Sequence, residues 1–176
     1  MSSQDIRQAR LRAGIALDHA ACRLHRAICG HADRGLSVAI ARYFFGDAAL
    51  YGPLHSRVCK ARRKLRTARI EAVFYTDPAR PDQSLADAAT ELGVPAYADP
   101  PNRIVLLPAW FDDPVRPLRP GRIIHELFHM SFKFVRNHDT SRPQTNAFAY
   151  QGLVCDLAGL RAPRPQQLYP ERISQP

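Results

Sequence analysis

The chain has 176 residues and carries 25 lysines and arginines against 16 aspartates and glutamates, a formal net charge of +9. Its 45% hydrophobic and 23% charged residues are typical of a globular protein and exclude an intrinsically disordered chain. No apolar run approaches the roughly 20 residues of a transmembrane helix. The first residues also lack the basic and then apolar pattern of a signal peptide. We therefore expect a protein without a membrane span, either cytoplasmic or exported without a cleaved signal.

Three helices are predicted in the first third of the chain. The first spans about Ser3–Ile28 and ends at Gly30, because glycine readily takes the left-handed conformation that follows a helix. The second spans Leu36–Phe45, and the third begins near Pro53, which fits the first turn of a helix. The apolar side of the first helix is expected to consist of Ile6, Leu11, Ile15, Leu17, Leu24 and Ile28.

The third helix is strongly basic on one side. Its apolar residues recur at helical spacing, so the basic residues occupy the opposite face, which we interpret as a solvated surface. An attraction to nucleic acid, anionic lipid or cell wall is the alternative. The chain has no zinc-finger spacing and no aromatic recognition motif, so no nucleic-acid partner is predicted. The apolar residues are Leu54, Val58, Ala61, Leu65 and Ala68, and the basic residues are Arg57, Lys60, Arg62, Arg63, Lys64, Arg66 and Arg69.

The four cysteines are too few and too scattered for a disulfide scaffold. They are Cys22, Cys29, Cys59 and Cys155, and none forms a CxxC pair of the kind that binds zinc. Cys22 and Cys29 lie seven residues apart, a spacing that predicts burial on one helix face. A disulfide between Cys29 and Cys59 stays open for a protein that works outside the cytoplasm.

The hydrophobic period changes after the third helix. Arg69–Tyr75 alternates and is predicted to be a strand, and Arg103–Leu107 is a second strand, apolar enough to be covered on both faces. Helices are predicted at Ser84–Leu92, Pro120–Val135 and Thr145–Leu160. This order of helices, a small sheet and further helices indicates a mainly helical α+β fold.

No internal repeat and no linker divides the chain. The sequence therefore predicts one domain over residues 1–162. Residues 163–176 are rich in proline and are predicted to form an extended tail.

A His-Glu-Leu-Phe-His segment, residues 125–129, carries the chemistry that the sequence indicates. Two histidines four residues apart lie one turn apart on one helix face, so both rings can reach a single zinc ion. A glutamate directly after the first histidine can act as the base for a zinc-activated water. His125 and His129 are therefore the predicted metal ligands, with Glu126 as the predicted catalytic base. The neighbouring apolar residues predict a buried helix, in which a charged carboxyl needs a partner.

A third protein ligand is needed, and the residues leave it open. Asp139 lies ten residues beyond His129, with His138 beside it and Asp156 on the next predicted helix. The metzincin class is excluded, because Phe132 occupies the position of the glycine in its motif. A glutamate-ligand arrangement would have to use Glu171, in the proline-rich tail.

With these residues laid out, the chain resembles the aspzincin metallopeptidases, the family of deuterolysin and peptidyl-Lys metalloendopeptidase. Besides the motif, an aromatic-Phe-Gly element, an apolar strand that ends in an aromatic pair and an Asn-Ala-x-x-Tyr element occur in the family's order. The four segments are Arg42–Gly46, Ile104–Phe111, Arg122–His129 and Asn146–Tyr150.

The resemblance implies a zincin-like fold and a Zn²⁺ site in which Asp139 joins His125 and His129. It also implies that Tyr150 donates a hydrogen bond to the oxyanion, while a plain core aromatic remains the alternative. Three features depart from the family. No Gly-Thr pair precedes Asp139, no tyrosine follows it three residues later, and Phe148 stands where the family has an aspartate.

The expected function is that of a zinc endopeptidase acting on a protein or peptide. A basic, signal-less version of this fold resembles toxin-like metallopeptidases that bacteria deliver into competitors. That resemblance implies an exported antibacterial effector, with a secretion apparatus and an immunity protein as partners. The alternatives are a zinc hydrolase of peptidoglycan peptide crosslinks and a non-catalytic, zinc-stabilised binding module.

Overall fold

The computed structural model of the protein describes residues 3–46, 48–73, 94–132 and 142–161. Within these ranges the fold is mainly helical with one small sheet, which confirms the predicted α+β class at this level. No helix of the described part is both long enough and apolar enough to span a membrane. The helices are α1 (Ser3–Ile28), α2 (Arg34–Phe44), α3 (Tyr51–Thr67), α5 (Arg119–Ser131) and α6 (Ala147–Leu157), and the strands are β1 (Arg69–Ala72), β2 (Ala96–Asp99) and β3 (Arg103–Leu106).

The three described strands form a mixed sheet in the order β1-β3-β2. β1 pairs with β3 in parallel, whereas β2 pairs with β3 antiparallel. Because side chains alternate along a strand, Ile104 and Leu106 of β3 point into the core shared with the helices. Val105 and the following Leu107 face the other way, where Tyr97 packs against them. β3 is therefore buried on both faces, as predicted.

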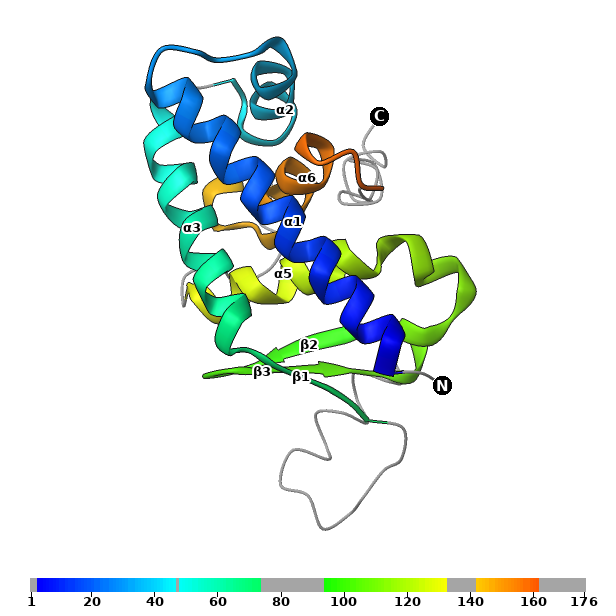
Figure 1. The fold of residues 1–176 in the computed structure, drawn as a ribbon. Coiled ribbons are helices and arrows are strands. Elements are labelled where there is room, and N and C mark those ends of the chain that lie inside the picture. The colour runs from blue at the N-terminus through cyan, green and yellow to red at the C-terminus, as the bar shows by residue number, and fades with distance from the viewer. Residues whose placement is uncertain (1–2, 47, 74–93, 133–141, 162–176) are drawn as a thin grey trace, which may run out of the picture.

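The helices gather on one side of the sheet (Figure 1), with α5 at the centre. α5 contacts α1, α3 and α6, and it also lies against β2. Close approach of α6 depends on Gly121 of α5, where an added Cβ would lie 2.9 Å from the Gln151 amide nitrogen. In this central position no residue of α5 is exposed.

The buried side of α1 differs from the prediction. Leu17 and Leu24 are buried as expected, but Leu11 and Ile15 are 65% and 58% exposed, and Ile28 is exposed as well. Alanines form most of the buried side instead, because small side chains let α3 and α5 approach the α1 backbone closely. The buried alanines of α1 are Ala9, Ala13, Ala16, Ala20, Ala21 and Ala27.

The expected burial of Cys22 and Cys29 is also wrong, since both are exposed. Cys22 follows the exposed Ile15 by seven residues, so it lies on the same outer side of α1. Of the other cysteines, Cys59 is half-buried and Cys155 is buried. No disulfide links any of the four, all of which lie in the described residues.

The remaining helix predictions hold to within a few residues. α2 ends at Phe44, and both Phe45 and Gly46 then take positive φ angles, which terminates the helix. In α3 the predicted apolar face is buried, with Leu54 and Val58 fully enclosed. α5 is shorter than predicted, because Phe132 is already extended with a φ of −141°.

One strand was not predicted at all. β2 contains two alanines and an aspartate, which are depleted in strands, and its pairing with β3 is what keeps it extended. The predicted helix at residues 84–92 and the proline-rich tail lie outside the described residues.

Candidate metal centre

The helix α5 carries buried polar side chains among buried apolar ones. Ile123, Ile124, Leu127 and Phe128 are fully buried, and they hold the helix against its neighbours. Pro120 lies in the first turn, where its missing N–H and fixed φ suit a helix start. A helix buried on this scale excludes water from its polar side chains, so each of them needs a chemical reason to be present.

The two predicted metal ligands face each other on α5. His125 is 5% exposed and His129 is half-buried, and their rings meet edge to face with centroids 4.7 Å apart. Their Nε2 atoms are 3.0 Å apart. Two nitrogens on one tetrahedral zinc, each about 2.0–2.1 Å from the ion, would be about 3.3 Å apart. The observed separation therefore fits the pair as two ligands of one zinc ion.

Glu126 lies between α5 and the sheet. Its side chain is 6% exposed, and its carboxylate accepts a hydrogen bond from the backbone N–H of Ala98 in β2. Burial raises the pKa of Glu126 to about 8, against the Ala98 hydrogen bond and the positive charge of Arg122, which both lower it. The helix thus carries a buried carboxyl on the residue that follows His125, and burial favours the protonated form of that carboxyl.

The position of Ala98 follows from the strand pairing. The N–H of Leu107 donates to the carbonyl of Pro95 at 3.0 Å, and Tyr97 is opposite Val105 in the same register. Hydrogen-bonded positions alternate along an antiparallel pair, so the backbone groups of Ala98 point away from β3. Glu126 is therefore bound at the outer edge of the described sheet.

Phe148 of α6 packs on His125. Its ring centroid is 4.3 Å from that of His125, and the guanidinium of Arg122 lies 6.0 Å from the Phe148 ring. The side chain of Asn146 caps α6 by accepting a 2.9 Å hydrogen bond from the N–H of Phe148. In the sequence, Phe148 was notable only because it replaces an aspartate of the aspzincin pattern. No local sequence pattern predicts its contact with His125.

Tyr150, the predicted oxyanion donor, is fully buried among aromatic rings. It stacks on Phe128 at 4.3 Å and meets Phe44 edge to face at 5.2 Å. Its hydroxyl donates to the carbonyl of Gln144 at 2.8 Å and accepts from Arg57. Burial raises the pKa of Tyr150, while Arg57 lowers it. The hydroxyl is thus occupied within the core, and its catalytic role stays a prediction.

The third ligand falls largely outside the described structure. Both Asp139 and its neighbour His138 belong to residues 133–141, which the structure does not describe. Asp156 is described, and its carboxylate accepts a 2.5 Å hydrogen bond from Arg42 of α2 as part of an ion pair. Within the described ranges no three His, Cys, Asp or Glu side chains form a group that could hold a metal ion. The structure therefore brings the rings of His125 and His129 together, whereas the carboxyl of Glu126 is bound at Ala98 and Asp156 is paired with Arg42.

Comparison with known proteins yields no match to this chain among family models, curated proteins or solved structures.

Proposed function

We propose that this protein is a zinc-dependent endopeptidase with its reaction centre on α5. The observation that carries the proposal is the pair of imidazole nitrogens, 3.0 Å apart on one helix face, with a buried carboxyl on the adjacent residue. An enclosed carboxyl with a raised pKa beside two potential ligands is typical of a reaction centre. The aspzincin resemblance described above points to the same chemistry.

The histidines and the glutamate have different roles in this proposal. His125 and His129 would hold the ion through their Nε2 atoms. Zinc in such a site polarises a substrate carbonyl and lowers the pKa of bound water to about 7. Glu126 accepts the proton of the attacking water and passes it to the amine that leaves. The N–H of Ala98 holds the carboxylate in place, and this hydrogen bond and the charge of Arg122 favour its ionised form against the effect of burial.

The position of β2 at the sheet edge favours a peptide as the substrate. β2 is the outer strand of the described sheet on the side of α5. An extended peptide can add to such an edge through main-chain hydrogen bonds, which are independent of its sequence. Since Glu126 is bound at Ala98 on this edge, a peptide aligned there would lie within reach of the base.

The proposal is tested by a Glu126→Gln variant, which keeps the shape of the side chain and removes its basicity. We expect about one zinc per chain in both proteins and a loss of at least about 100-fold in the cleavage of a dye-labelled unfolded protein. Zinc is measured by elemental analysis after purification without chelator.

Other outcomes would replace the proposal. Cleavage of purified sacculi without cleavage of unfolded protein would favour a peptidoglycan crosslink as the substrate. Zinc binding with no hydrolysis of either substrate would favour a binding module. The absence of zinc from the purified protein would overturn the catalytic assignment itself. Export as an antibacterial effector rests on the resemblance alone and stays a prediction.

A further inference from the structure

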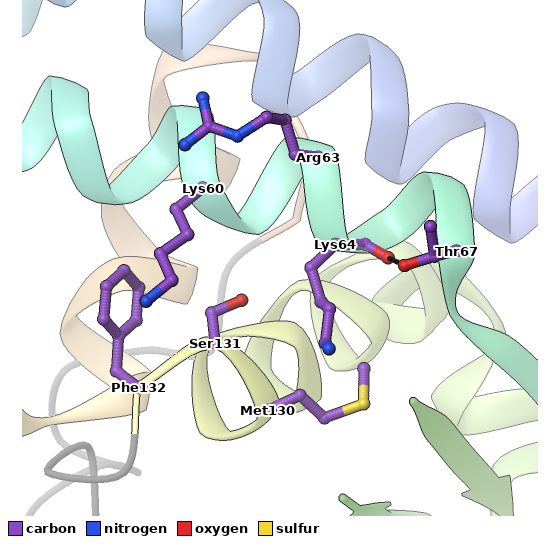
Figure 2. A pocket seen from close by; sticks show the side chains of 7 residues that line it. All are labelled: Lys60, Arg63, Lys64, Thr67, Met130, Ser131 and Phe132. Atoms are coloured by element: carbon purple, nitrogen blue, oxygen red, sulfur yellow. Dashed lines mark hydrogen bonds between the residues drawn. The ribbon is translucent and has the colours of Figure 1, made fainter. Parts of the chain in front are cut away.

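A pocket of about 700 Å³ lies between α3 and the C-terminal end of α5 (Figure 2). Three cationic residues of α3, Lys60, Arg63 and Lys64, line one side. The other side is formed by Met130 and Ser131 of α5 and by Phe132, which ends that helix. Its volume is within the range of about 300–1,000 Å³ that is usual for ligand pockets. We refer to it as the basic pocket.

The cations of the basic pocket lack acidic partners within the described structure. Residues 60, 63 and 64 share one face of α3, so their charges repel one another. The ammonium group of Lys60 lies 4.7 Å from the centre of the Phe132 ring, and that of Lys64 donates to the side-chain oxygen of Asn102 at 2.5 Å. These partners are neutral, so the excess of positive charge is not cancelled.

The ends of the two helices do not cancel it either. α3 and α5 both end near the basic pocket, and the C-terminus of a helix carries roughly half a negative charge. Two helix ends offset about one unit of positive charge, so an excess of positive charge remains. A pocket with this excess attracts an anion.

Ser131 provides a second, independent indication of a ligand. The residue is 8% exposed, and its Oγ has no hydrogen-bond partner in the described structure. A buried hydroxyl without a partner is costly, and most such groups are satisfied in folded proteins. Figure 2 shows Ser131 between Lys60 and Lys64, whose side chains extend toward α5, while Arg63 points away. The flexible stems of the lysines can rearrange, so that one anion contacts both ammonium groups and the serine.

The walls favour a carboxylate on an alkyl stem. Met130 and Phe132 offer apolar surface beside the charges, which suits the methylene groups of a glutamate or aspartate side chain. Free mineral phosphate has no part that would use this surface. Phe132 follows His129 by three residues at the end of α5, so the two residues lie within about one helical turn of each other along the helix axis. A few residues of extended peptide, each spanning about 3.3 Å, cover such a distance.

We propose that the basic pocket binds an acidic side chain of the peptide substrate, a few residues from the bond that is cleaved. This inference rests on the proposed peptidase function for its biological role, whereas the binding itself does not require cleavage. The expected preference for acidic peptides thus arises from the residues of α3 and of the end of α5 that line the basic pocket.

Binding is measured by fluorescence anisotropy on the full chain carrying Glu126→Gln, so that the peptide is not consumed. The probes are a dye-labelled ten-residue peptide of alternating glutamate and alanine and its matched glutamine peptide. We expect the acidic peptide to bind at least about tenfold more tightly and to be released by salt. Lys60→Gln with Lys64→Gln should weaken its binding at least about tenfold, and Ser131→Ala about three- to tenfold.

The matched control is Arg66→Gln, which removes one charge from an exposed position of α3 outside the basic pocket. It should change the affinity less than about twofold. Equal binding of the two peptides, or an equal loss with Arg66→Gln, would overturn the inference. Displacement of the peptide by millimolar inorganic phosphate would also overturn it, because the site would then be one for the free anion.

Cleavage by the wild-type protein separates this inference from the proposed function. Binding of the acidic peptide without any cleavage would refute the peptidase and leave the basic pocket as a peptide-binding site. Equal cleavage of the acidic and glutamine peptides, with equal affinities, would refute the pocket and leave the peptidase.

Discussion

Two pairs of histidines lie close together in the described part of this protein, and they differ in how they arise. His25 and His55 come from different helices, α1 and α3, and their ring centroids are 5.5 Å apart. His125 and His129 come from one helix, with centroids 4.7 Å apart. The first pair is brought together by packing of α1 on α3, whereas the second follows from the geometry of a single turn.

The surroundings separate the two pairs further. Each histidine of the first pair is followed four residues later by a cysteine. The Cys29 Sγ is 3.9 Å from the Nε2 of His25, and the Cys59 Sγ is 3.5 Å from that of His55. These donors also suit zinc, but His25 is exposed, and neither histidine of this pair is directly followed by an acidic residue in the sequence. The buried pair has Glu126 next to it. Proximity of histidines alone is therefore a weak indication of a reaction centre, and burial beside a carboxyl is a stronger one.

The largest expected effect would show which pair holds zinc. His129→Ala removes one of two Nε2 ligands, so we expect the zinc content to fall from about one ion per chain to trace level, with hydrolysis lost. The matched variant His55→Ala should keep both. Elemental analysis and circular dichroism check the metal and the fold. Loss of zinc from the His55 variant, with retention in the His129 variant, would assign the metal to the other pair.

The third ligand gives the next largest effect. Asp139→Ala should weaken zinc binding by more than the roughly 10- to 100-fold that follows loss of an outer partner. Asp156→Ala should leave zinc affinity unchanged, because that carboxylate is paired with Arg42. Titration with a competing chelator measures both affinities. The reverse order would refute the aspzincin-like ligand set and still permit an HExxH site.

A smaller effect on zinc affinity is expected when Phe148, which packs on His125, is replaced. Phe148→Ala removes the ring that packs on His125, so the imidazole loses an orienting contact. We expect zinc affinity to fall about tenfold, as for other outer contacts of a metal site. Phe45→Ala, at an exposed aromatic after α2, is the control and should leave affinity unchanged. Equal affinities in the two variants would mean that Phe148 only fills space.

The smallest effect concerns the pair of His25 and His55 and the pH dependence of the protein's stability. Burial, and then the nearby charge of His25, lower the pKa of His55 below its ordinary value of 6.5. The unfolded chain therefore binds a proton at a pH where folded His55 does not, and stability falls as the pH decreases below about 6.5. His55→Asn should lose less stability between pH 7.5 and 5.5 than the wild type. Urea unfolding at both pH values measures the difference, and equal losses would contradict it.

The sequence predicted the helices well and the edges of the sheet poorly. α1, α2 and α3 were placed to within about two residues, because their caps and apolar periods are local signals. β2 has no such signal, since its short, alanine-containing sequence becomes a strand only through pairing with β3. The exposure of Leu11 and Ile15 was missed for a related reason. Apolar residues mark a helix face, but the packing of α3 and α5 decides which face is covered.

The same distinction between local signals and tertiary packing applies to the candidate site. The sequence by itself determined that His125 and His129 share a helix face and that Glu126 accompanies them, since helical spacing fixes these relations. Only the tertiary structure decided that Glu126 is bound at Ala98, that Phe148 covers His125, and that Lys60 and Lys64 meet Ser131 in one pocket. These contacts join residues far apart in the chain. They depend on how the elements pack, and a local period carries no information about that packing.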